Sequence, residues 1–372
     1  MIVRVLQVVT IMNTGGIETL LMNIYRNIDR ERIQFDFLVH RTEKGFYDDE
    51  IIQLGGNIYY VPPINPLKHK KYIKKLDSFF KDKASLYNIV HSHINTWSLY
   101  ILRASEKAGI PIRISHSHVS SPKLSYKSFF QEYNKLFIKQ YATHLFACSI
   151  AAGNYLFGED CETLDNFYYF NNGVDLDKFA FNLETRKKIR KELLLDDSLI
   201  VIHVGNFSKP KNYPKLIEVF YNIVQLENKS KLLLVGNGPL RTKVKNIISK
   251  YGIEENVIFL GVRSDVYDLL QAADIFILPS LFEGLPLSVI EAQVSGILTI
   301  ISDKVPKQAL ITKNAASICL KLSSKQWSKD ILKMYLTSSR ETQSKEFIDA
   351  GYSINRNTKW LTDFYLKEID KL

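Results

Sequence analysis

The sequence predicts an α/β protein with two doubly wound parallel sheets. Apolar runs of strand length alternate with helical periodicities along the chain, and this alternation runs through two series. Between the two series, residues 171–195 interrupt the pattern with an Asn-Asn-Gly-Val-Asp turn and a charged stretch. Alternating strands and helices favour parallel sheets, and the length of 372 residues suggests about two domains.

The first series opens with a β-rich run at residues 2–9, which leads into a Gly-bearing loop and a helix. The helix is predicted from apolar residues that recur at helical spacing, namely Ile17, Leu20, Leu21, Ile24 and Ile28. The further strands expected in this series are residues 35–39, 57–61, 88–91, 110–115 and 144–148.

The second series has expected strands at residues 199–204, 231–235, 257–260, 275–278 and 298–301. Helices are expected between them at residues 213–226, 240–251 and 266–273. The tail, residues 355–372, also has a helical pattern. Because open parallel sheets bind ligands at the carboxyl ends of their strands, we expect the ligand loops of the two domains to face a shared cleft.

Composition places the chain among globular proteins. Its 46% apolar and 24% charged content excludes a disordered, collagen-like or coiled-coil chain. Cys148, Cys161 and Cys319 show no metal-ligand spacing, which argues against structural zinc and a disulfide framework and favours a reducing compartment. The N-terminal residues indicate a strand and not a signal peptide, and no apolar run approaches the roughly 18 residues of a membrane span. We expect a soluble or peripheral protein.

Positive charge is concentrated in one window. Residues 64–140 contain 14 lysines and arginines against 4 acidic residues, whereas residues 1–63 and 141–175 contain 6 against 13. An interfacial helix on anionic lipid has basic and aromatic residues at such spacing, and so does a solvated basic face whose rings lie in the core. Nucleic acid is a third possible partner of a basic surface, but the sequence contains no pattern typical of a nucleic-acid-binding protein. The interleaved aromatic residues are Tyr72, Phe79, Phe80, Tyr126, Phe129, Phe130, Tyr133 and Phe137.

Residues 280–292 carry the strongest chemical signal. They follow the apolar run 275–278; Gly284 allows close backbone approach, and Pro286 suits the first turn of a helix. Free N–H groups at such a helix start favour an anion such as a diphosphate. Glu283 and Glu291, eight positions apart, are expected to flank that anion. The alternative is a strand-to-helix turn with two solvated acids.

This segment resembles the E-x7-E region of the retaining glycosyltransferases of glycosyltransferase family 4, which have the GT-B fold. The resemblance extends over essentially the whole chain and is closest to the branch that builds bacterial capsular and exopolysaccharides. Further matching segments occur in the family's order: Gly15-Gly16-Ile17-Glu18, His91-Ser92-His93, His116-Ser117-His118, Asn172-Gly173-Val174-Asp175, residues 204–212, Gly236-Asn237-Gly238-Pro239 and residues 259–265.

The resemblance implies a particular domain organisation. Residues 1–174 would form an acceptor-side Rossmann-like domain and residues 175–350 a Rossmann-like domain that binds the nucleotide-sugar. Residues 351–372 would form a C-terminal helix that crosses back to the first domain.

The resemblance also implies an activity. A hexose or N-acetylhexosamine would pass from a nucleotide-sugar to a glycan or lipid-linked acceptor in surface polysaccharide biosynthesis, with retention at the anomeric carbon. A UDP-sugar is the expected donor, with a GDP-sugar as the alternative. The expected location is the cytoplasm or the inner face of the cell membrane. A non-catalytic subunit that binds nucleotide-sugar or glycan for a partner transferase is the other hypothesis.

By the same resemblance, individual residues have expected roles. Glu291 would bind the ribose, Glu283 the donor sugar, and Lys211 the diphosphate. His116 or His118 would touch the donor sugar near the reacting carbon. The remaining expected donor-binding residues are Gly15, Gly16, Asn206, Val262, Arg263, Gly284, Leu285, Pro286 and Leu287. Because the leaving group is a nucleoside diphosphate, the main catalytic requirement is to stabilise its growing charge.

One position departs from the family pattern. Asn206 stands where the family usually carries an arginine directly after Gly205. Arginine offers phosphate a rigid two-pronged donor, whereas asparagine offers one neutral amide. Lys209 is a candidate substitute, and the retained Lys211 favours an active enzyme.

Three other patterns have alternative interpretations. The two H-x-H pairs, His91 with His93 and His116 with His118, could each chelate a metal, but neither window supplies a carboxylate or thiol ligand. We therefore expect no metal and no cofactor. Asp175-Leu176-Asp177 is interpreted as turn chemistry and not as a metal-binding D-x-D. Gly236-Asn237-Gly238 lacks the third glycine of a dinucleotide fingerprint, so an oxidoreductase is a weaker hypothesis.

Overall fold

The computed structural model describes residues 2–65, 69–118, 128–340 and 344–372. Its contacts divide the chain into two units: unit 1 comprises Met1–Gly173 and Ile354–Leu372, and unit 2 comprises Val174–Ser353. The sequence analysis predicted the domain boundaries at residues 174/175 and 350/351, whereas the contacts place them at 173/174 and 353/354. The chain crosses between the units twice. In unit 1, the residues where the chain leaves and re-enters the unit lie against each other, since a Cβ on Gly173 would lie 2.7 Å from the Cα of Ile354.

Unit 1 contains a 7-stranded parallel sheet with the order β3-β2-β1-β4-β5-β6-β7. Its strands are β1 (Val3–Val9), β2 (Ile33–Val39), β3 (Ile58–Tyr60), β4 (Ile89–Ser92), β5 (Ile112–Ser117), β6 (His144–Ala147) and β7 (Phe167–Tyr169). Its helices include α1 (Gly16–Asn27), α2 (Asp48–Gln53), α3 (His69–Lys83), α4 (Ser98–Lys107), α5 (Ser128–Tyr141), α6 (Ile150–Phe157) and α15 (Ile354–Ile369).

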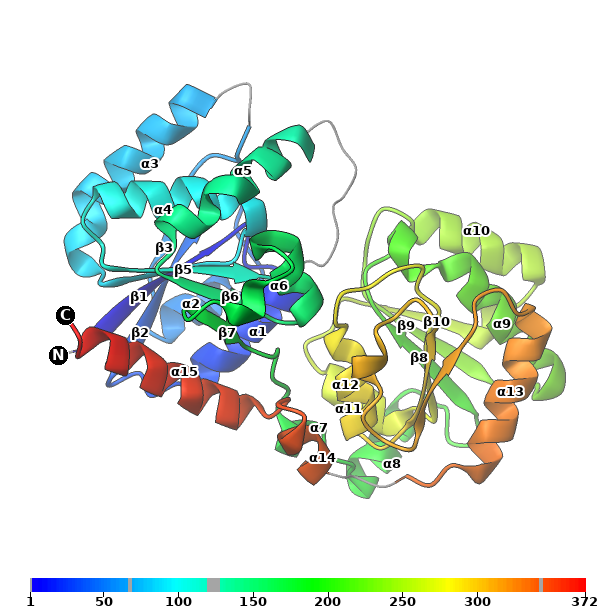
Figure 1. Ribbon diagram of the computed structural model, residues 1–372. Helices are drawn as coiled ribbons and strands as arrows, with labels where there is room; N and C mark the ends of the chain where they lie inside the picture. The colour runs from blue at the N-terminus through cyan, green and yellow to red at the C-terminus, as the bar shows by residue number, and fades with distance from the viewer. Residues whose placement is uncertain (1, 66–68, 119–127, 341–343) are drawn as a thin grey trace. The chain divides into compact units, whose positions relative to one another are not determined.

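Helices cover both faces of this sheet, as Figure 1 shows. On one face, α3 and α4 pack on β1, β2 and β4 through an apolar cluster that includes Tyr72 and Phe80. On the other face, α1 and the C-terminal α15 pack through a cluster that includes Tyr25, Phe35 and Tyr365. The expected helical tail therefore belongs to the core of unit 1, where Tyr365 is fully buried.

Unit 2 contains a 6-stranded parallel sheet with the order β10-β9-β8-β11-β12-β13. Its strands are β8 (Ile200–Val204), β9 (Lys231–Val235), β10 (Val257–Gly261), β11 (Ile275–Leu278), β12 (Leu298–Ser302) and β13 (Ala315–Ile318). Its helices include α7 (Leu176–Phe179), α8 (Leu183–Glu192), α9 (Tyr213–Leu226), α10 (Arg241–Tyr251), α11 (Val266–Ala272), α12 (Leu287–Val294), α13 (Ser324–Thr337) and α14 (Ser344–Asp349).

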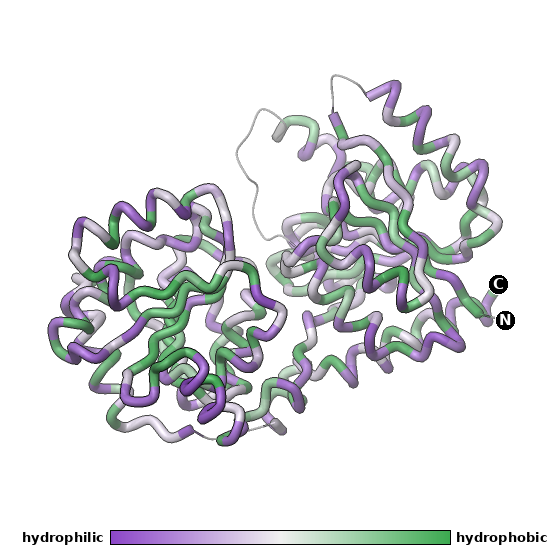
Figure 2. Tube along the Cα trace, turned by 180° about the vertical axis from the view of Figure 1, so that it is seen from behind, coloured by the Kyte–Doolittle hydropathy of each residue, from purple (hydrophilic) through white to green (hydrophobic). Residues whose placement is uncertain are grey.

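The predicted fold class is confirmed, with strand boundaries that differ by a few residues. Both sheets are buried between helix layers. In unit 2 the central strands β9 and β11 are almost continuous apolar runs, and the strands of its sheet are green in Figure 2. The central strands of unit 1 also carry buried polar residues, among them Gln7 and His91. The sequence-based analysis missed β7 and β13, the short strands at the sheet edges, where burial is incomplete and the apolar pattern is weak.

The structure also bears on the expectations about the cysteines and about membrane-spanning segments. Cys148, Cys161 and Cys319 are all free thiols. None of the helices in the described part of the chain has both the length and the apolar character of a bilayer-spanning segment.

Candidate functional site

The topology of unit 2 places a switch point between β8 and β11. These strands are neighbours in the sheet, but the chain leaves β8 toward β9 and leaves β11 toward β12. In open parallel sheets, ligands generally bind at such a switch point, at the carboxyl ends of the strands. The loops that follow the two strands are joined by the Leu281 N–H, which donates to the Pro210 carbonyl at 2.7 Å, and by the Asn212 amide, which donates to the Pro279 carbonyl at 3.0 Å.

The loop after β8 directs Lys211 toward the loop after β11. The lysine side chain lies over Gly205, where a Cβ would be 3.0 Å from Lys211 Cε. The Tyr213 hydroxyl donates to the Gly205 carbonyl at 2.9 Å. The Tyr213 ring also stacks on Phe207 with centroids 4.4 Å apart. These contacts hold the loop, and a side chain at position 205 would require the Lys211 side chain to shift.

Lys211 meets Glu283 from the loop after β11. Lys211 Nζ lies 2.8 Å from Glu283 Oε1, and the two side chains are 16% and 14% exposed. The Ser280 hydroxyl donates to the same carboxylate oxygen at 2.7 Å. An ammonium has three N–H donors, and in the described part of the chain Glu283 is its only ion-pair partner. Lys211 therefore keeps hydrogen-bonding capacity and is partly exposed to solvent.

Helix α12 begins directly after this loop. It is eight residues long, with Pro286 at its N-cap, so the first N–H groups of Leu287 and Ser288 have no carbonyl within the helix to accept them. Glu291 lies one turn further along α12 and is partly buried. Burial raises the pKa of Glu291 to about 7.

The loop after β10 carries the predicted donor-binding residues Val262 and Arg263, and the loop after β9 carries Gly236 of the matching segment Gly236-Asn237-Gly238-Pro239. Gly236 has a φ of +131°, and a Cβ there would lie 2.2 Å from the Gly205 carbonyl oxygen, so this close approach requires glycine. Val262 is exposed. The Arg263 guanidinium is held by Asp265, with Nε 2.7 Å from Oδ1. Asn206 is exposed on the β8 loop.

In unit 1, Gly15 and Gly16 start helix α1. Gly15 is the N-cap of α1, and a Cβ there would lie 2.1 Å from a carboxylate oxygen of Glu18. The Glu18 side chain therefore folds back over the glycine at the helix start. Burial raises the pKa of Glu18 to about 7.

The four histidines of the H-x-H pairs form one cluster at the carboxyl ends of β4 and β5. His91 Nε2 lies 3.1 Å from His116 Nδ1, and His93 Nδ1 lies 3.0 Å from His118 Nε2. Burial lowers the pKa of all four rings, with that of His118 at about 3. The ligand nitrogens of His91, His93 and His116 lie within 4.8 Å of one another, a spacing open to a metal ion.

Two residues of this cluster were missed by the sequence analysis. Gln7 is a fully buried amide in β1, and its Oε1 lies 2.9 Å from His93 Nε2. The Tyr365 hydroxyl on α15 lies 2.7 Å from His91 Nδ1. A polar residue inside the apolar run 2–9 was an available signal for Gln7. No local signal exists for Tyr365, because it is separated from His91 by 274 residues.

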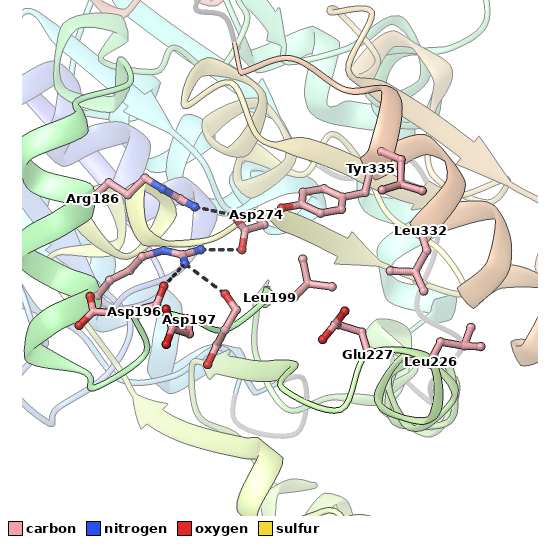
Figure 3. A pocket seen from close by; sticks show the side chains of 12 residues that line it. Arg186, Asp196, Asp197, Leu199, Leu226, Glu227, Asp274, Leu332 and Tyr335 are labelled. Atoms are coloured by element: carbon pink, nitrogen blue, oxygen red, sulfur yellow. Dashed lines mark hydrogen bonds and ion pairs between the residues drawn. The ribbon is translucent and has the colours of Figure 1, made fainter.

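The pocket in Figure 3 lies at the opposite, amino-terminal edge of the unit 2 sheet and is lined by residues such as Arg186, Arg190 and Asp274. Its guanidinium groups are already occupied. Arg186 donates to Asp274 and to the carbonyls that end α11. Arg190 donates to Asp274 and to the carbonyls of Ala272, Asp196 and Ser198. This arrangement stabilises a helix end and leaves little capacity for a ligand.

Two further sequence patterns have local explanations. Asp175 caps α7 by accepting the Lys178 N–H at 3.0 Å. On α3 every lysine except Lys83 is exposed, while Tyr72 and Phe80 are buried, which fits a solvated basic face. On α5 Phe129, Phe130 and Tyr133 are exposed instead, whereas Phe137 packs against an apolar cluster. Parts of the basic window, among them Lys68 and Tyr126, lie outside the described residues.

Comparison with known proteins identifies relatives along the full chain. Residues 185–353 match the family model described as "Glycosyl transferases group 1". The chain is 31% identical over 374 residues to the "Putative glycosyltransferase EpsF" of Bacillus subtilis, covering 97% of this chain and 96% of that protein. It is 27% identical over 387 residues to the capsular polysaccharide biosynthesis glycosyltransferase CapH of Staphylococcus aureus, covering 98% and 99%.

Another relative is the Escherichia coli UDP-Gal:alpha-D-GlcNAc-diphosphoundecaprenol alpha-1,3-galactosyltransferase, 28% identical over 291 residues that cover 73% of this chain and 72% of that protein. Among solved structures, Anabaena HepE in complex with UDP and glucose has a TM-score of 0.79 at 17% identity, covering 98% of this chain and 100% of that one. This likeness confirms the GT-B fold. The relatives carry the names of transferases, which supports a catalytic protein over the non-catalytic alternative. The chain belongs to the group 1 glycosyl transferases, as its resemblance to family 4 predicted.

Proposed function

We propose that this glycosyltransferase moves a hexose or N-acetylhexosamine from a UDP-sugar to a glycan or lipid-linked acceptor in surface polysaccharide biosynthesis. We further propose that the anomeric configuration is retained and that no metal takes part. The observation that carries the proposal is the ion pair of Lys211 and Glu283 at the β8/β11 switch point, next to the start of α12.

The chemistry follows from where charge develops. As the glycosidic bond to the nucleotide breaks, negative charge grows on the departing diphosphate. Lys211 and the first N–H groups of α12 can donate to it, and a preorganised donor of this kind is worth about 10²–10³ in rate. This cationic cradle can do without a metal ion. Glu283 accepts hydroxyls of the donor sugar, and Glu291 accepts hydroxyls of the ribose.

The donor and acceptor classes draw on named relatives. HepE was solved with UDP and glucose, and the E. coli relative is named for UDP-Gal and a diphosphoundecaprenol-linked acceptor. CapH is named for capsular polysaccharide biosynthesis. These names support uracil over guanine as the base and a lipid-linked glycan as the acceptor.

The test is a panel of UDP- and GDP-sugars, scored for thermal stabilisation and slow donor hydrolysis, because a ligand stabilises the folded state it binds. We expect UDP-sugars to stabilise the protein and to be hydrolysed, and EDTA to leave the rate unchanged. The product of an α-linked donor should again carry an α linkage. No response to any donor, with Glu291→Ala indistinguishable from wild type, would contradict the proposal. Activity lost in EDTA and restored by a divalent ion would contradict its metal-free part.

The proposal extends to an anionic membrane surface contacted by unit 1. Helix α5 exposes an apolar face made of Phe129, Phe130, Tyr133 and Leu136, of which Phe129 is 79% exposed. These residues recur at helical spacing on the side of α5 away from buried Ile138. Such rings at the surface suit the boundary between lipid headgroups and acyl chains.

Positive charge accompanies this apolar face. Helix α3 contacts α4, which contacts α5. A groove of about 410 Å³ between α3 and α4 is lined by basic side chains that include Lys70, Lys74, Arg103 and Lys107. Lipid phosphates match this charge, and each lysine or arginine near an anionic membrane contributes about 1 kcal/mol.

Sedimentation with phosphatidylglycerol vesicles tests the membrane contact. Charge reversal of Lys70, Lys71, Lys74 and Lys75 should abolish binding, and binding of the wild type should weaken as salt rises. The matched control reverses four exposed lysines of unit 2, Lys250, Lys325, Lys329 and Lys333, and should still bind. A wild type that ignores these vesicles would leave α3 as a solvated face.

A further inference from the structure

The histidine cluster of unit 1 is built across that unit's own switch point. Strands β1 and β4 are neighbours in the sheet, and Gln7 of β1 is directly opposite His91 of β4. The four histidine rings continue from this position along the carboxyl ends of β4 and β5. Two hydrogen-bonded chains start from the single amide of Gln7 and run through these rings.

The first chain runs through Tyr365. The Gln7 amide Nε2 donates to the Tyr365 hydroxyl at 3.4 Å, so the hydroxyl proton is directed to His91 Nδ1, 2.7 Å away. A neutral imidazole carries one proton, so His91 holds it on Nε2 and donates it to His116 Nδ1 at 3.1 Å. His116 is then left with a proton on Nε2.

The second chain starts from the other end of the same amide. Gln7 Oε1 accepts, so His93 carries its proton on Nε2, 2.9 Å away. His93 Nδ1 is then bare and accepts from His118 Nε2 at 3.0 Å. His118 is left with a bare Nδ1. The order of donors and acceptors is opposite in the two chains because an amide donates at one end and accepts at the other.

Both chains end on buried atoms. Among the described residues, neither His116 Nε2 nor His118 Nδ1 has a hydrogen-bond partner. The two rings lie side by side with centroids 4.0 Å apart. One end is a donor and the other an acceptor. Rotating the Gln7 amide by half a turn reverses both chains together, so this complementarity holds in either orientation.

The neutral state that this scheme needs is supported by burial. His91, His93 and His116 are at most 3% exposed, and burial lowers the pKa of each ring well below its ordinary value. Neutral rings also fit the close ring-to-ring contacts, which two imidazolium ions would oppose.

We propose that Gln7 is a positioning residue that sets one common tautomer on all four histidines, so that His116 Nε2 and His118 Nδ1 offer a paired donor and acceptor to one hydroxyl group of a sugar. A hydroxyl both donates and accepts, whereas a phosphate or carboxylate oxygen only accepts. The sugar as ligand rests on the proposed function; the tautomer assignment does not.

The tautomers are read directly from two-bond ¹H–¹⁵N spectra of the whole protein labelled on histidine. In the wild type all four rings should be protonated on the same nitrogen, either Nε2 or Nδ1. Gln7→Glu replaces the amide by a group that accepts at both ends. Tyr365 then donates to residue 7, so His91 and His116 should hold Nδ1–H while His93 and His118 hold Nε2–H. A mixed pattern in the wild type, doubly protonated rings, or no change in the variant would overturn the proposal.

Tyr365→Phe provides a second test if the glutamate variant does not fold. It breaks only the first chain, so the spectra of His91 and His116 should change while His93 and His118 keep their tautomer. A change in all four rings, or in none, would contradict the assignment. Zinc added alone should shift none of them; binding that shifts His91, His93 and His116 would identify a metal site instead.

Kinetics and ligand titration test the hydroxyl contact. UDP-glucose, but not UDP alone, should shift the free ring nitrogens of His116 and His118. Gln7→Glu should lower kcat/KM by about 10- to 100-fold with little change in the Kd for UDP. The matched control is Gln34→Glu on β2, a buried amide that donates to the Leu54 carbonyl, which should keep kcat/KM within about threefold. If no nucleotide-sugar is turned over while the tautomer pattern holds, the proposed function fails and the positioning role of Gln7 stands.

Discussion

The two edges of the unit 2 sheet carry similar charges with different consequences. At the carboxyl edge, Lys211 pairs with Glu283. At the amino edge, Arg186 and Arg190 each lie 2.6 Å from a carboxylate oxygen of Asp274. The arginines also donate to the carbonyls that end α11, whereas Lys211 keeps N–H donors that are not used in an ion pair. Charge alone therefore does not indicate a ligand-binding site in this domain; a charged group must also have hydrogen-bonding capacity that the protein does not use.

The largest expected effect is on stability and comes from removing the carboxylate at the amino edge of the unit 2 sheet. Asp274→Asn leaves two partly buried guanidinium groups without their carboxylate, which typically costs about 3–5 kcal/mol. We expect a loss of this size in the free energy of unfolding, measured in urea, with little change in the KM for donor at temperatures where the variant is folded. Asp197→Asn, an exposed position in the same pocket, is the control. A loss below about 1 kcal/mol would show that the arginine cluster is not structural.

The next largest expected effect is on activity and comes from removing the lysine at the carboxyl edge of the same sheet. Lys211→Met removes the proposed donor to the leaving diphosphate and should lower kcat by about 10²–10³. Lys325→Met, at an exposed position of α13, is the control and should change kcat by less than about threefold. Because Glu283 is left unpaired, the double variant Lys211→Met/Glu283→Gln should recover thermal stability but not activity. Full activity in either Lys211 variant would remove this lysine from the mechanism.

A smaller effect concerns Glu291. Loss of a hydrogen bond to a charged group costs about 1.5–3 kcal/mol, so Glu291→Gln should raise the KM for a UDP-sugar about 10- to 100-fold. Exposed Glu184→Gln is the control for charge.

Glu291 also predicts a pH dependence of stability. Burial raises its pKa from 4.5 to about 7, so between these values the folded state holds a proton that the unfolded chain has released. Its contribution to stability is therefore lost as pH rises through this window. The free energy of unfolding of Glu291→Gln, relative to wild type, should increase from about pH 5 to about pH 8. A flat difference would mean that Glu291 is not buried in solution.

The smallest expected effect is a gain in activity from adding a cationic side chain at the carboxyl edge of the unit 2 sheet. Asn206→Arg restores a two-pronged phosphate donor on the β8 loop. We expect kcat/KM to rise by up to about tenfold, which corresponds to roughly 1.4 kcal/mol. Turnover that exists only in this variant would instead support the accessory-subunit hypothesis.

The sequence alone was sufficient for much of the architecture. Continuous apolar runs mark central strands because both faces of a parallel sheet are covered, so β9 and β11 were predicted with their observed bounds. Edge strands such as β13 bury less surface and leave a weaker pattern. Segment 280–292 could be proposed as a donor-binding segment from the sequence because its glycine, proline and acids are local in the chain.

Tertiary structure decided which of these residues meet. The contact of Lys211 with Glu283 depends on β8 lying beside β11, and the order of strands in a sheet has no local signature. The same holds for Gln7 and Tyr365, which lie 358 positions apart in sequence yet complete one hydrogen-bonded cluster. Local patterns report burial and backbone conformation, whereas the partner of a buried polar group is chosen by packing of the whole domain.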